Sequence, residues 1–422
     1  MWVRKRIDIG WSDLGAGMLH ALRPFDRKAA GRGLERAWSE ADDALACLSV
    51  RSGFDLLLGT LDLPPGSEVL VSAVTIPDMV RIIREHGLVP VPVDVDIESM
   101  APKLERIQAA VTPATRAILV AHLCGGRFPI GPVVELAERH GLLLLEDCAQ
   151  AFAGPGYRGD PAADVSMFSF GPIKTATSLA GALLRVRDPE LLGRMRTRQA
   201  AYPVQSRAYY FRRLWKYTAM KVGAMRPVLA GIVAYWKLRG WDPDRMINGT
   251  ARGFPGPAFF SMIRKQPSAP LLALMRRRLR RFNTDRLARR TARGEFLVKY
   301  LDGRVTCPGT RTRPHTHWVF PVLADNPDEV IAALAGAGFD ATQGQSMCVV
   351  DPPPDRPELE PAEARLMLAK TVYLPFYPEM PEKPFRRMID LMLEELVPAS
   401  VSAVGPGVEP APAYASSTYP SR

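Results

Sequence analysis

The sequence predicts an α/β protein with a mostly parallel central sheet, helices on both faces of that sheet, and a smaller C-terminal α+β domain. From about residue 45 to 186, short apolar runs alternate with amphipathic stretches. Near-continuous apolar strands separated by helices are typical of a parallel sheet that is covered on both faces. A chain of 422 residues is also too long for one small core, so a second packed part is expected.

The elements of the sheet follow in order along this stretch. Strands are expected at 45–50, 67–74, 88–96, 116–123 and 142–147, and shorter β-rich runs at 165–170 and 181–187 complete the set. Helices are expected at 54–63, 77–87, 99–111 and 129–141. The helix at 77–87 has a proline at its first position and a glycine at its end, as helix-terminus chemistry favours.

The later part of the chain has a different character. A basic helix or helix pair is expected at 269–301, a strand at 315–324, a helix at 327–339, a strand and turn at 371–380, and a last helix at 383–396. We therefore divide the chain into an N-terminal arm (1–44), a large ligand-binding domain (45–200), a basic aromatic insertion (201–255), a small C-terminal domain (256–398) and a tail (399–422). The tail is rich in Pro, Ala and Ser, which is typical of disorder.

Composition narrows the class of protein. The net charge of +11 favours anionic partners. The five cysteines are scattered and contain no CxxC pair, which argues against a disulfide framework and a structural metal site and fits a reducing cytoplasm. The N-terminus lacks the apolar run of a signal peptide, and no apolar stretch approaches the roughly 20 residues that cross a bilayer.

Several polar groups are predicted to meet at the carboxyl edge of the sheet, where such folds bind ligands. Asp147 ends the strand "LLLLED", and Gln150 follows it by three residues. Ser169 ends the run "VSMFS", and Lys174 follows in the connection "GPIKTATSLAG". A lysine in a dry loop can lose its proton and attack carbonyls, although a loop lysine with its ammonium in solvent is the simpler interpretation.

A phosphate site is predicted at the turn Ser52-Gly53, between a strand and a helix, because free amides and the helix dipole attract anions there. An amine, a carboxylate, an amide, a hydroxyl and a phosphate cradle are together the groups that pyridoxal 5′-phosphate (PLP) requires.

The motifs resemble a known family. "HGLLLLEDCAQAFAG…VSMFSFGPIK" looks like the DegT/DnrJ/EryC1/StrS family of fold-type I sugar aminotransferases, in which "IEDAAQA" precedes "FSFHxxK". "VRSG" at 50–53, "TPATRAILVAHLCG" and "TVYLPFYPEM" parallel further segments of that family. Several motifs that agree in order and spacing form a specific signal. The resemblance is good over roughly 45–190, loose from 256 to 398, and absent in 200–250.

The resemblance implies a homodimeric PLP-dependent aminotransferase that moves an amino group from a donor such as glutamate to a keto acceptor, possibly a keto-sugar. Lys174 would be the Schiff-base lysine that also carries the proton, and Asp147 would pair with the pyridine nitrogen. Gln150 would lie against the ring and Ser169 would contact the phosphate. Gly53 and Phe54 would offer backbone amides to the phosphate, and Ile76 would cover the ring.

The sequence departs from the family at some of these positions. Phe54 replaces a small residue or Thr, and Ile76 replaces a stacking aromatic ring. Because of these changes the sequence does not identify the substrate, and two alternative functions stay open. One is a PLP-dependent lyase or dehydratase of the same fold, and the other is a non-catalytic, membrane-associated relative.

Other features have competing interpretations. His122 is either catalytic or a strand-end histidine bonded to backbone, and His315 and His317 fit edge-strand residues better than metal ligands. The run "RRRLRR" at 276–281 fits a solvated helix face, a subunit contact or an anion patch, of which the solvated face is favoured, and no nucleic-acid-binding fold accompanies it. The stretch 206–241 mixes cations with aromatics, and we interpret it as packing within a dimer, a lid, or a peripheral membrane contact.

Overall fold

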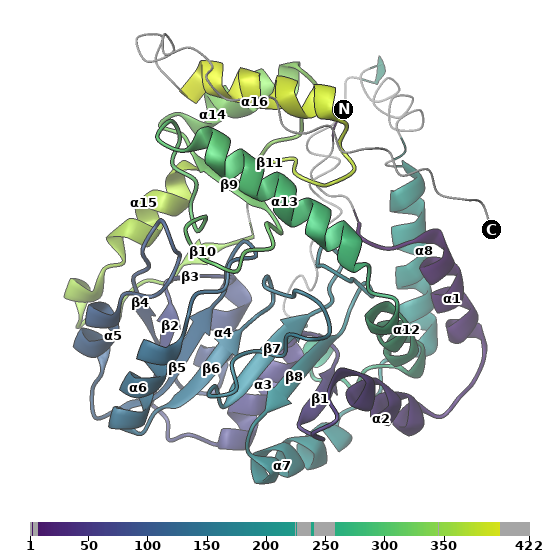
Figure 1. The fold of residues 1–422 in the computed structure, drawn as a ribbon. Coiled ribbons are helices and arrows are strands. Elements are labelled where there is room, and N and C mark those ends of the chain that lie inside the picture. Colours follow the sequence, from purple (N-terminus) through teal and green to yellow (C-terminus); the bar gives the residue numbers. More distant parts are fainter. Residues whose placement is uncertain are drawn as a thin grey trace.

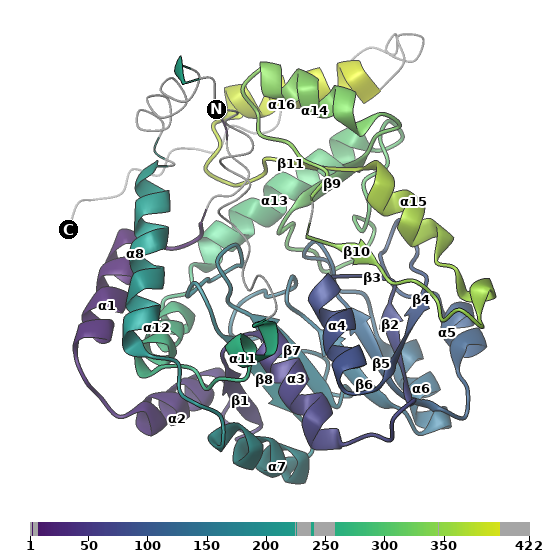
Figure 2. The same cartoon turned by 180° about the vertical axis from the view of Figure 1, so that it is seen from behind.

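The structure is a computed structural model that describes residues 2, 7–223, 225, 238–239, 258–344 and 346–396. The tail 399–422 and residues 224, 226–237 and 240–255 of the predicted insertion lie outside the described residues, and with them much of the stretch 206–241. Figures 1 and 2 show a central sheet between two layers of helices, with a further group of helices (α13, α14 and α16) above it.

The central sheet has seven strands in the order β1–β8–β7–β6–β5–β2–β4. The strands are β1 (Ala44–Cys47), β2 (Glu68–Ser72), β4 (Val89–Val93), β5 (Thr115–Ala121), β6 (Leu143–Asp147), β7 (Val165–Ser169) and β8 (Ala182–Val186). Only β8 runs antiparallel to its neighbours in this sheet, β1 and β7. The prediction of a mostly parallel sheet is confirmed.

Side chains of the strands alternate between two cores, as the twofold period of a strand requires. Leu45 and Cys47 of β1 belong to a core with α3 (Val50–Leu61), α4 (Pro77–Glu85) and α7 (Pro189–Ala200). Ala44 and Ala46 belong to the opposite core, which α1 (Trp11–Leu22), α2 (Arg27–Trp38), α8 (Arg207–Gly223) and α12 (Ala269–Arg280) complete. Farther along the same face, α5 (Leu104–Ala110) and α6 (Gly131–His140) cover β4, β5 and β6.

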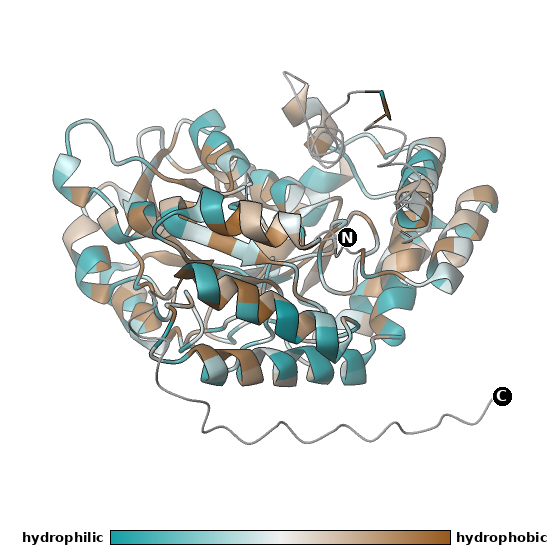
Figure 3. Cartoon of the chain, turned by 90° about the horizontal axis from the view of Figure 1, so that it is seen from above, coloured by the Kyte–Doolittle hydropathy of each residue, from teal (hydrophilic) through white to brown (hydrophobic). Residues whose placement is uncertain are grey.

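The C-terminal residues build a separate core. It joins α13 (Thr284–Leu301), α14 (Pro327–Gly336) and α16 (Glu382–Leu396) to the antiparallel pair β9 (Phe320–Leu323) and β11 (Thr371–Leu374). The remaining described elements are β3 (Val74–Thr75), which pairs with β10 (Cys348–Val349), the short helix α11 (Phe259–Ile263), α15 (Ala362–Lys370) and a 3₁₀ turn at Pro357–Leu359. Figure 3 shows hydrophobic and hydrophilic residues alternating along the helices, which is the pattern of helices that cover a core on one side.

The arginine run 276–281 is a solvated face only in part, because Arg280 and Arg281 are exposed but Arg277 and Arg278 are not. Arg277 Nε and Arg278 Nη1 each donate to the Asp13 carboxylate at 2.7 Å, and Asp13 is buried. Arg278 also donates to the Asp8 carbonyl at 2.6 Å. Asp13 lies in α1, far away in the sequence, so the run ties α12 to the N-terminal arm.

Candidate active site

Lys174 lies in the loop that joins β7 to β8, at the carboxyl end of β7. The loop turns tightly, because the Lys174 amide donates to the Gly171 carbonyl at 3.0 Å. Segments far apart in the chain hold this loop by hydrogen bonds: Asp8 to the Ala176 amide, Tyr210 to the Ser178 carbonyl, Arg290 to the Thr175 hydroxyl, and Trp318 to the Ile173 carbonyl. The lysine therefore has a defined position next to the sheet.

The electrostatic surroundings of Lys174 favour a neutral amine. Burial lowers the pKa of Lys174 to about 8, the Asp147 carboxylate opposes this shift, and the Arg51 guanidinium adds to it. At pH 8 the Lys174 amine is then uncharged in about half of the molecules, whereas an ordinary lysine with a pKa near 10.5 is almost always protonated at that pH. Lys174 thus has the property that a nucleophilic amine needs.

Asp147 ends β6, the strand next to β7, and interacts electrostatically with Lys174. Burial raises the pKa of Asp147, while the Ala149 amide, which donates to its Oδ1 at 2.8 Å, and the charge of Lys174 lower it. Gln150 follows, and its Oε1 accepts from the Cys124 amide at 2.9 Å. The structure therefore brings the predicted carboxylate and amine together at one sheet edge, with Gln150 fixed beside them.

The N-terminus of α3 begins farther upstream than predicted, which corrects the phosphate turn. Helix α3 starts at Val50, and Ser49 is its N-cap: Ser49 Oγ accepts from the Ser52 amide at 3.1 Å. The Gly53 amide donates to the Ser49 carbonyl at 3.0 Å, and Phe54 lies deeper in the helix, where amides are paired internally. The predicted Gly53 and Phe54 amides are thus inside the helix, so an anion at this helix end would meet the turn that begins at Val50 and not these two amides.

Gly53 has a packing role instead. A Cβ at this position would lie 2.6 Å from Leu184 Cδ1 of β8, closer than atoms can approach, so glycine lets α3 lie directly on the sheet. Phe54 is fully buried in the same core.

We expect Gly53→Ala to lower the free energy of unfolding by about 1–3 kcal/mol, because the extra methyl group overpacks this contact. Gly193→Ala is the matched control: Gly193 lies inside α7, and its Cβ would meet nothing within 4 Å. That change should stabilise the protein by up to about 1 kcal/mol through helix propensity. Urea unfolding of both variants checks the pair, and equal effects would contradict the packing role.

Two residues near Lys174 were missed from the sequence. Arg51 lies in the first turn of α3, its Nε binds the Asp78 carboxylate, and it affects the pKa of both Lys174 and Asp147. The Trp318 ring lies 4.1 Å from Lys174 Nζ, measured to the ring centroid. No local pattern marks either residue, because the chain fold alone brings them to the lysine.

The other predicted site residues lie at the ends of elements around the same edge. Ser169 is the last residue of β7, and its Oγ accepts from the Gly171 amide at 3.4 Å. Ile76 is the residue that precedes α4, and it is partly buried against the core around α3. Their contacts with a ligand stay predictions.

His122 takes part in a buried network, so the interpretation of a side chain bonded to backbone was wrong. Its Nε2 lies 2.8 Å from Glu146 Oε1, and Glu146 also accepts from Ser166 Oγ at 2.7 Å and from the Asp160 amide at 2.9 Å. Although burial opposes it, hydrogen bonding from His122 and Ser166 lowers the pKa of Glu146 to about 2. This network lies beneath Asp147, whose carbonyl accepts from the His122 amide at 3.0 Å.

His315 and His317 are buried in the segment before β9. The His317 amide donates to His315 Nδ1 at 2.9 Å, and the two ring centroids are 4.0 Å apart. Burial lowers the pKa of His315 to about 3. Among the described residues, one group of three has ligand atoms close enough to hold a metal ion: His122, Glu146 and Cys148. His315 and His317 do not belong to that group.

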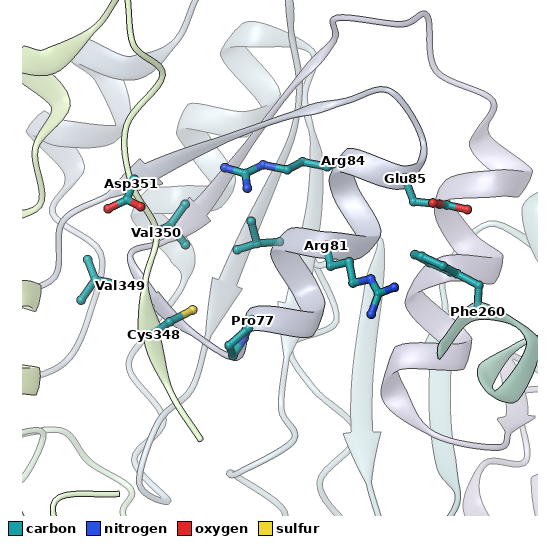
Figure 4. Close-up of a pocket in the computed structure, with 10 residues that line it drawn as sticks. Pro77, Arg81, Arg84, Glu85, Phe260, Cys348, Val349, Val350 and Asp351 are labelled. Carbon is teal, nitrogen blue, oxygen red and sulfur yellow. The ribbon is translucent and has the colours of Figure 1, made fainter. Parts of the chain in front are cut away.

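A separate hollow of about 600 Å³ lies between α4, α11 and β10 (Figure 4). Figure 4 shows Arg84 extending toward Val350 and Asp351, and Arg81 extending toward Phe260. Neither Lys174 nor Asp147 lines this hollow. Helix α4, which lines it, also carries Asp78, the partner of Arg51.

Comparisons with known proteins identify aminotransferases that this chain resembles. Residues 33–222 match the model of the DegT/DnrJ/EryC1/StrS aminotransferase family. The chain is 32% identical over 171 residues to the GDP-perosamine synthase of Caulobacter vibrioides, a match that covers 40% of this chain and 46% of the relative. The chain thus spans less than half the length of that curated relative.

Solved structures of aminotransferases share the fold. The aminotransferase TlmJ from Streptoalloteichus hindustanus is 20% identical with a TM-score of 0.67, and the match covers 94% of this chain and 99% of that one. The sugar aminotransferase CalS13 from Micromonospora echinospora is 19% identical with a TM-score of 0.65, and the match covers 93% of this chain and 100% of that one. The predicted α/β fold of PLP-dependent aminotransferases is confirmed.

Proposed function

We propose that the chain is a PLP-dependent aminotransferase, and the match of residues 33–222 to the model of the DegT/DnrJ/EryC1/StrS aminotransferase family supports this proposal. The observation that carries the proposal is the placement of Lys174 and Asp147 at the ends of neighbouring strands, close enough for each to shift the other's pKa. An amine and a carboxylate in such surroundings are the two groups that the proposed reaction needs.

The residues present fit PLP. When bound, PLP supplies an electron sink for the electrons released at the substrate carbon. The first turn of α3, starting at Val50, would meet its phosphate, and Arg51 adds a positive charge near that end. Asp147 would hold a proton on the ring nitrogen, Gln150 would lie beside the ring, and Lys174 would bind the aldehyde.

Lys174 would also act as the acid and base of the reaction. Its pKa near 8 lets Nζ take a proton from a substrate carbon and return it at neutral pH, which is the range where such exchange is most efficient. Trp318 lies over Nζ and limits the directions in which the amine can move. Asp147 keeps its position because the Ala149 amide binds Oδ1.

The proposed substrates are an amino donor such as glutamate and a keto acceptor. A keto-sugar acceptor is supported by the names of similar proteins, a GDP-perosamine synthase and a sugar aminotransferase. Ile76 and Arg51 lie at this site but do not by themselves identify the acceptor, so an experiment must determine it.

The test uses the purified full chain loaded with PLP. An absorbance band near about 410–430 nm should form, and glutamate should bleach it toward shorter wavelength. The bleached protein should then regain the band with one member of a panel of keto-sugars and keto acids. A loaded protein that releases ammonia or water from substrates without bleaching would support a lyase or dehydratase instead, and failure to bind PLP would overturn the proposal.

The proposal includes a homodimer in the cytoplasm. Five free cysteines, three of them buried, suit a reducing compartment. None of the described helices is long and apolar enough to cross a membrane. Light scattering of the purified protein measures the oligomeric state directly.

A further inference from the structure

Exposed large hydrophobic side chains gather on two neighbouring helices. Eight of them belong to α1, to α8 or to the residues directly after these helices: Trp11, Leu19, Leu22, Phe25, Tyr209, Trp215, Val222 and Met225. Trp215 is 63% exposed and Leu22 is 68% exposed. Such clustering marks an interaction surface, because single exposed apolar residues are otherwise scattered.

These side chains lie on and beside two adjacent helices, and we call the surface that they share the α1–α8 face. The two helices lie side by side along one edge of the molecule (Figures 1 and 2). At one end Lys221 Nζ lies 5.3 Å from the centroid of the Trp11 ring. At the other end Leu22 and Arg212 line the same shallow hollow of about 330 Å³. The exposed residues of α8 recur every three or four positions, so they share one side of that helix.

The opposite side of α8 is fixed to the protein core. Tyr210 and Leu214 are fully buried, and the Tyr210 hydroxyl donates to the Ser178 carbonyl at 2.7 Å. Arg213 Nε donates to the Leu179 carbonyl at 2.6 Å. Both acceptors lie in the loop that carries Lys174, so α8 is a rigid support whose outer side faces away from the core.

The charge of the α1–α8 face is mainly positive, although the exposed Asp26 lies beside Phe25 at one end of it. Helix α8 contains five basic residues and no acidic residue: Arg207, Arg212, Arg213, Lys216 and Lys221. The one carboxylate of α1, Asp13, is buried and bound by Arg277 and Arg278. Arg212 and Lys216 lie on the exposed side, next to Trp215.

This combination fits a lipid surface better than a second copy of the chain. In a twofold dimer a face meets itself, so with the axis at α8 the exposed Arg212 and Lys216 would approach their own copies, and α8 itself has no carboxylate to oppose them. At an anionic bilayer, by contrast, Trp, Tyr and Leu enter the headgroup region while Arg and Lys meet lipid phosphates. We propose that the α1–α8 face binds peripherally to the surface of an anionic phospholipid membrane.

The test is sedimentation of the full-length protein with vesicles. The protein should pellet with vesicles of about one-third phosphatidylglycerol in phosphatidylcholine at about 50 mM salt, and less at about 500 mM salt. It should pellet weakly with pure phosphatidylcholine. The variant Arg212→Gln/Lys216→Gln should lower the ratio of bound to free protein at least about tenfold. Trp215→Ser should lower the ratio of bound to free protein at both salt concentrations, because the substitution removes an apolar anchor.

The matched control is Arg289→Gln/Lys299→Gln, which removes the same charge from exposed positions of α13. It should change vesicle binding by less than about twofold, and unfolding midpoints should show that all variants are folded. No pelleting with anionic vesicles, or equal losses in both double variants, would overturn the proposal. So would a loss of oligomeric mass in Trp215→Ser without vesicle binding, which would identify the face as a subunit contact.

Discussion

Replacing Lys174 with alanine should lower turnover by at least about 10⁴-fold. The change removes the amine that would bind the aldehyde and the group that would carry the proton, and no second lysine in the described loop 170–181 can replace it. The absorbance band near about 410–430 nm should also disappear, although PLP can still bind through its phosphate.

The control for Lys174→Ala is Lys370→Ala. Lys370 donates to Asp325 at the surface and lies far from the sheet edge in the C-terminal part. This variant should keep the band and the turnover of the unmodified protein. Turnover by Lys174→Ala at a normal rate would contradict the assignment. Circular dichroism of the variant separates a loss of chemistry from a loss of folding, because an unfolded variant would show a lower unfolding midpoint.

Replacing Asp147 with asparagine should raise the barrier by about 3–5 kcal/mol, which is a loss of roughly 10²–10⁴-fold in turnover. Asparagine keeps the side-chain volume and an oxygen that can accept from the Ala149 amide, so the local fold should persist. It has no negative charge, so a proton on the pyridine nitrogen of PLP would lose its partner. Single-turnover rates with saturating glutamate measure the effect.

The matched control for Asp147→Asn is Asp164→Asn. Asp164 directly precedes β7, and like Asp147 it accepts from a backbone amide: its Oδ2 accepts from the Leu144 amide at 2.8 Å. The Asp164 carboxylate is not among the charges that shift the pKa of Lys174, so the Asp164→Asn variant should keep nearly the full rate. If Asp147→Asn retained the full rate while PLP stayed bound, the carboxylate would have no role in the chemistry.

The sequence predicted the sheet edge well for a physical reason. Buried parallel strands show as apolar runs, and their carboxyl ends lie at one edge whatever the details of the helices. Asp147 and Lys174 each follow such a run, so their proximity could be predicted from order alone. The same reasoning predicted where Gln150 and Ser169 lie.

The start of α3 could not be predicted as well. Ser49 and Ser52 are both good N-cap residues three positions apart, and the pair Ser52-Gly53 looks like a turn. Tertiary packing decides between them, because Gly53 lets α3 lie against Leu184 of β8. Starting the helix at Ser52 would move that close contact to another residue.

Ion pairs and contacts between residues far apart in the chain could also not be predicted from the sequence. Nothing near the arginine run 276–281 indicates that its partner is Asp13, some 260 positions earlier. Trp318 likewise reaches Lys174 only because the segment before β9 folds back over the loop. Local patterns report which residues are buried in an element, but not which distant side chain meets them.

The hydrogen bonds that hold the Lys174 loop have a consequence for biosynthesis. Asp8, Arg290 and Trp318 all lie outside the segment 33–222, so a polypeptide limited to that segment would lack these three anchors of the loop. During translation the loop can reach its final shape only after residue 318 of 422 has left the ribosome. Capture of the vitamin B6 coenzyme should therefore be a late event, completed on a nearly finished chain.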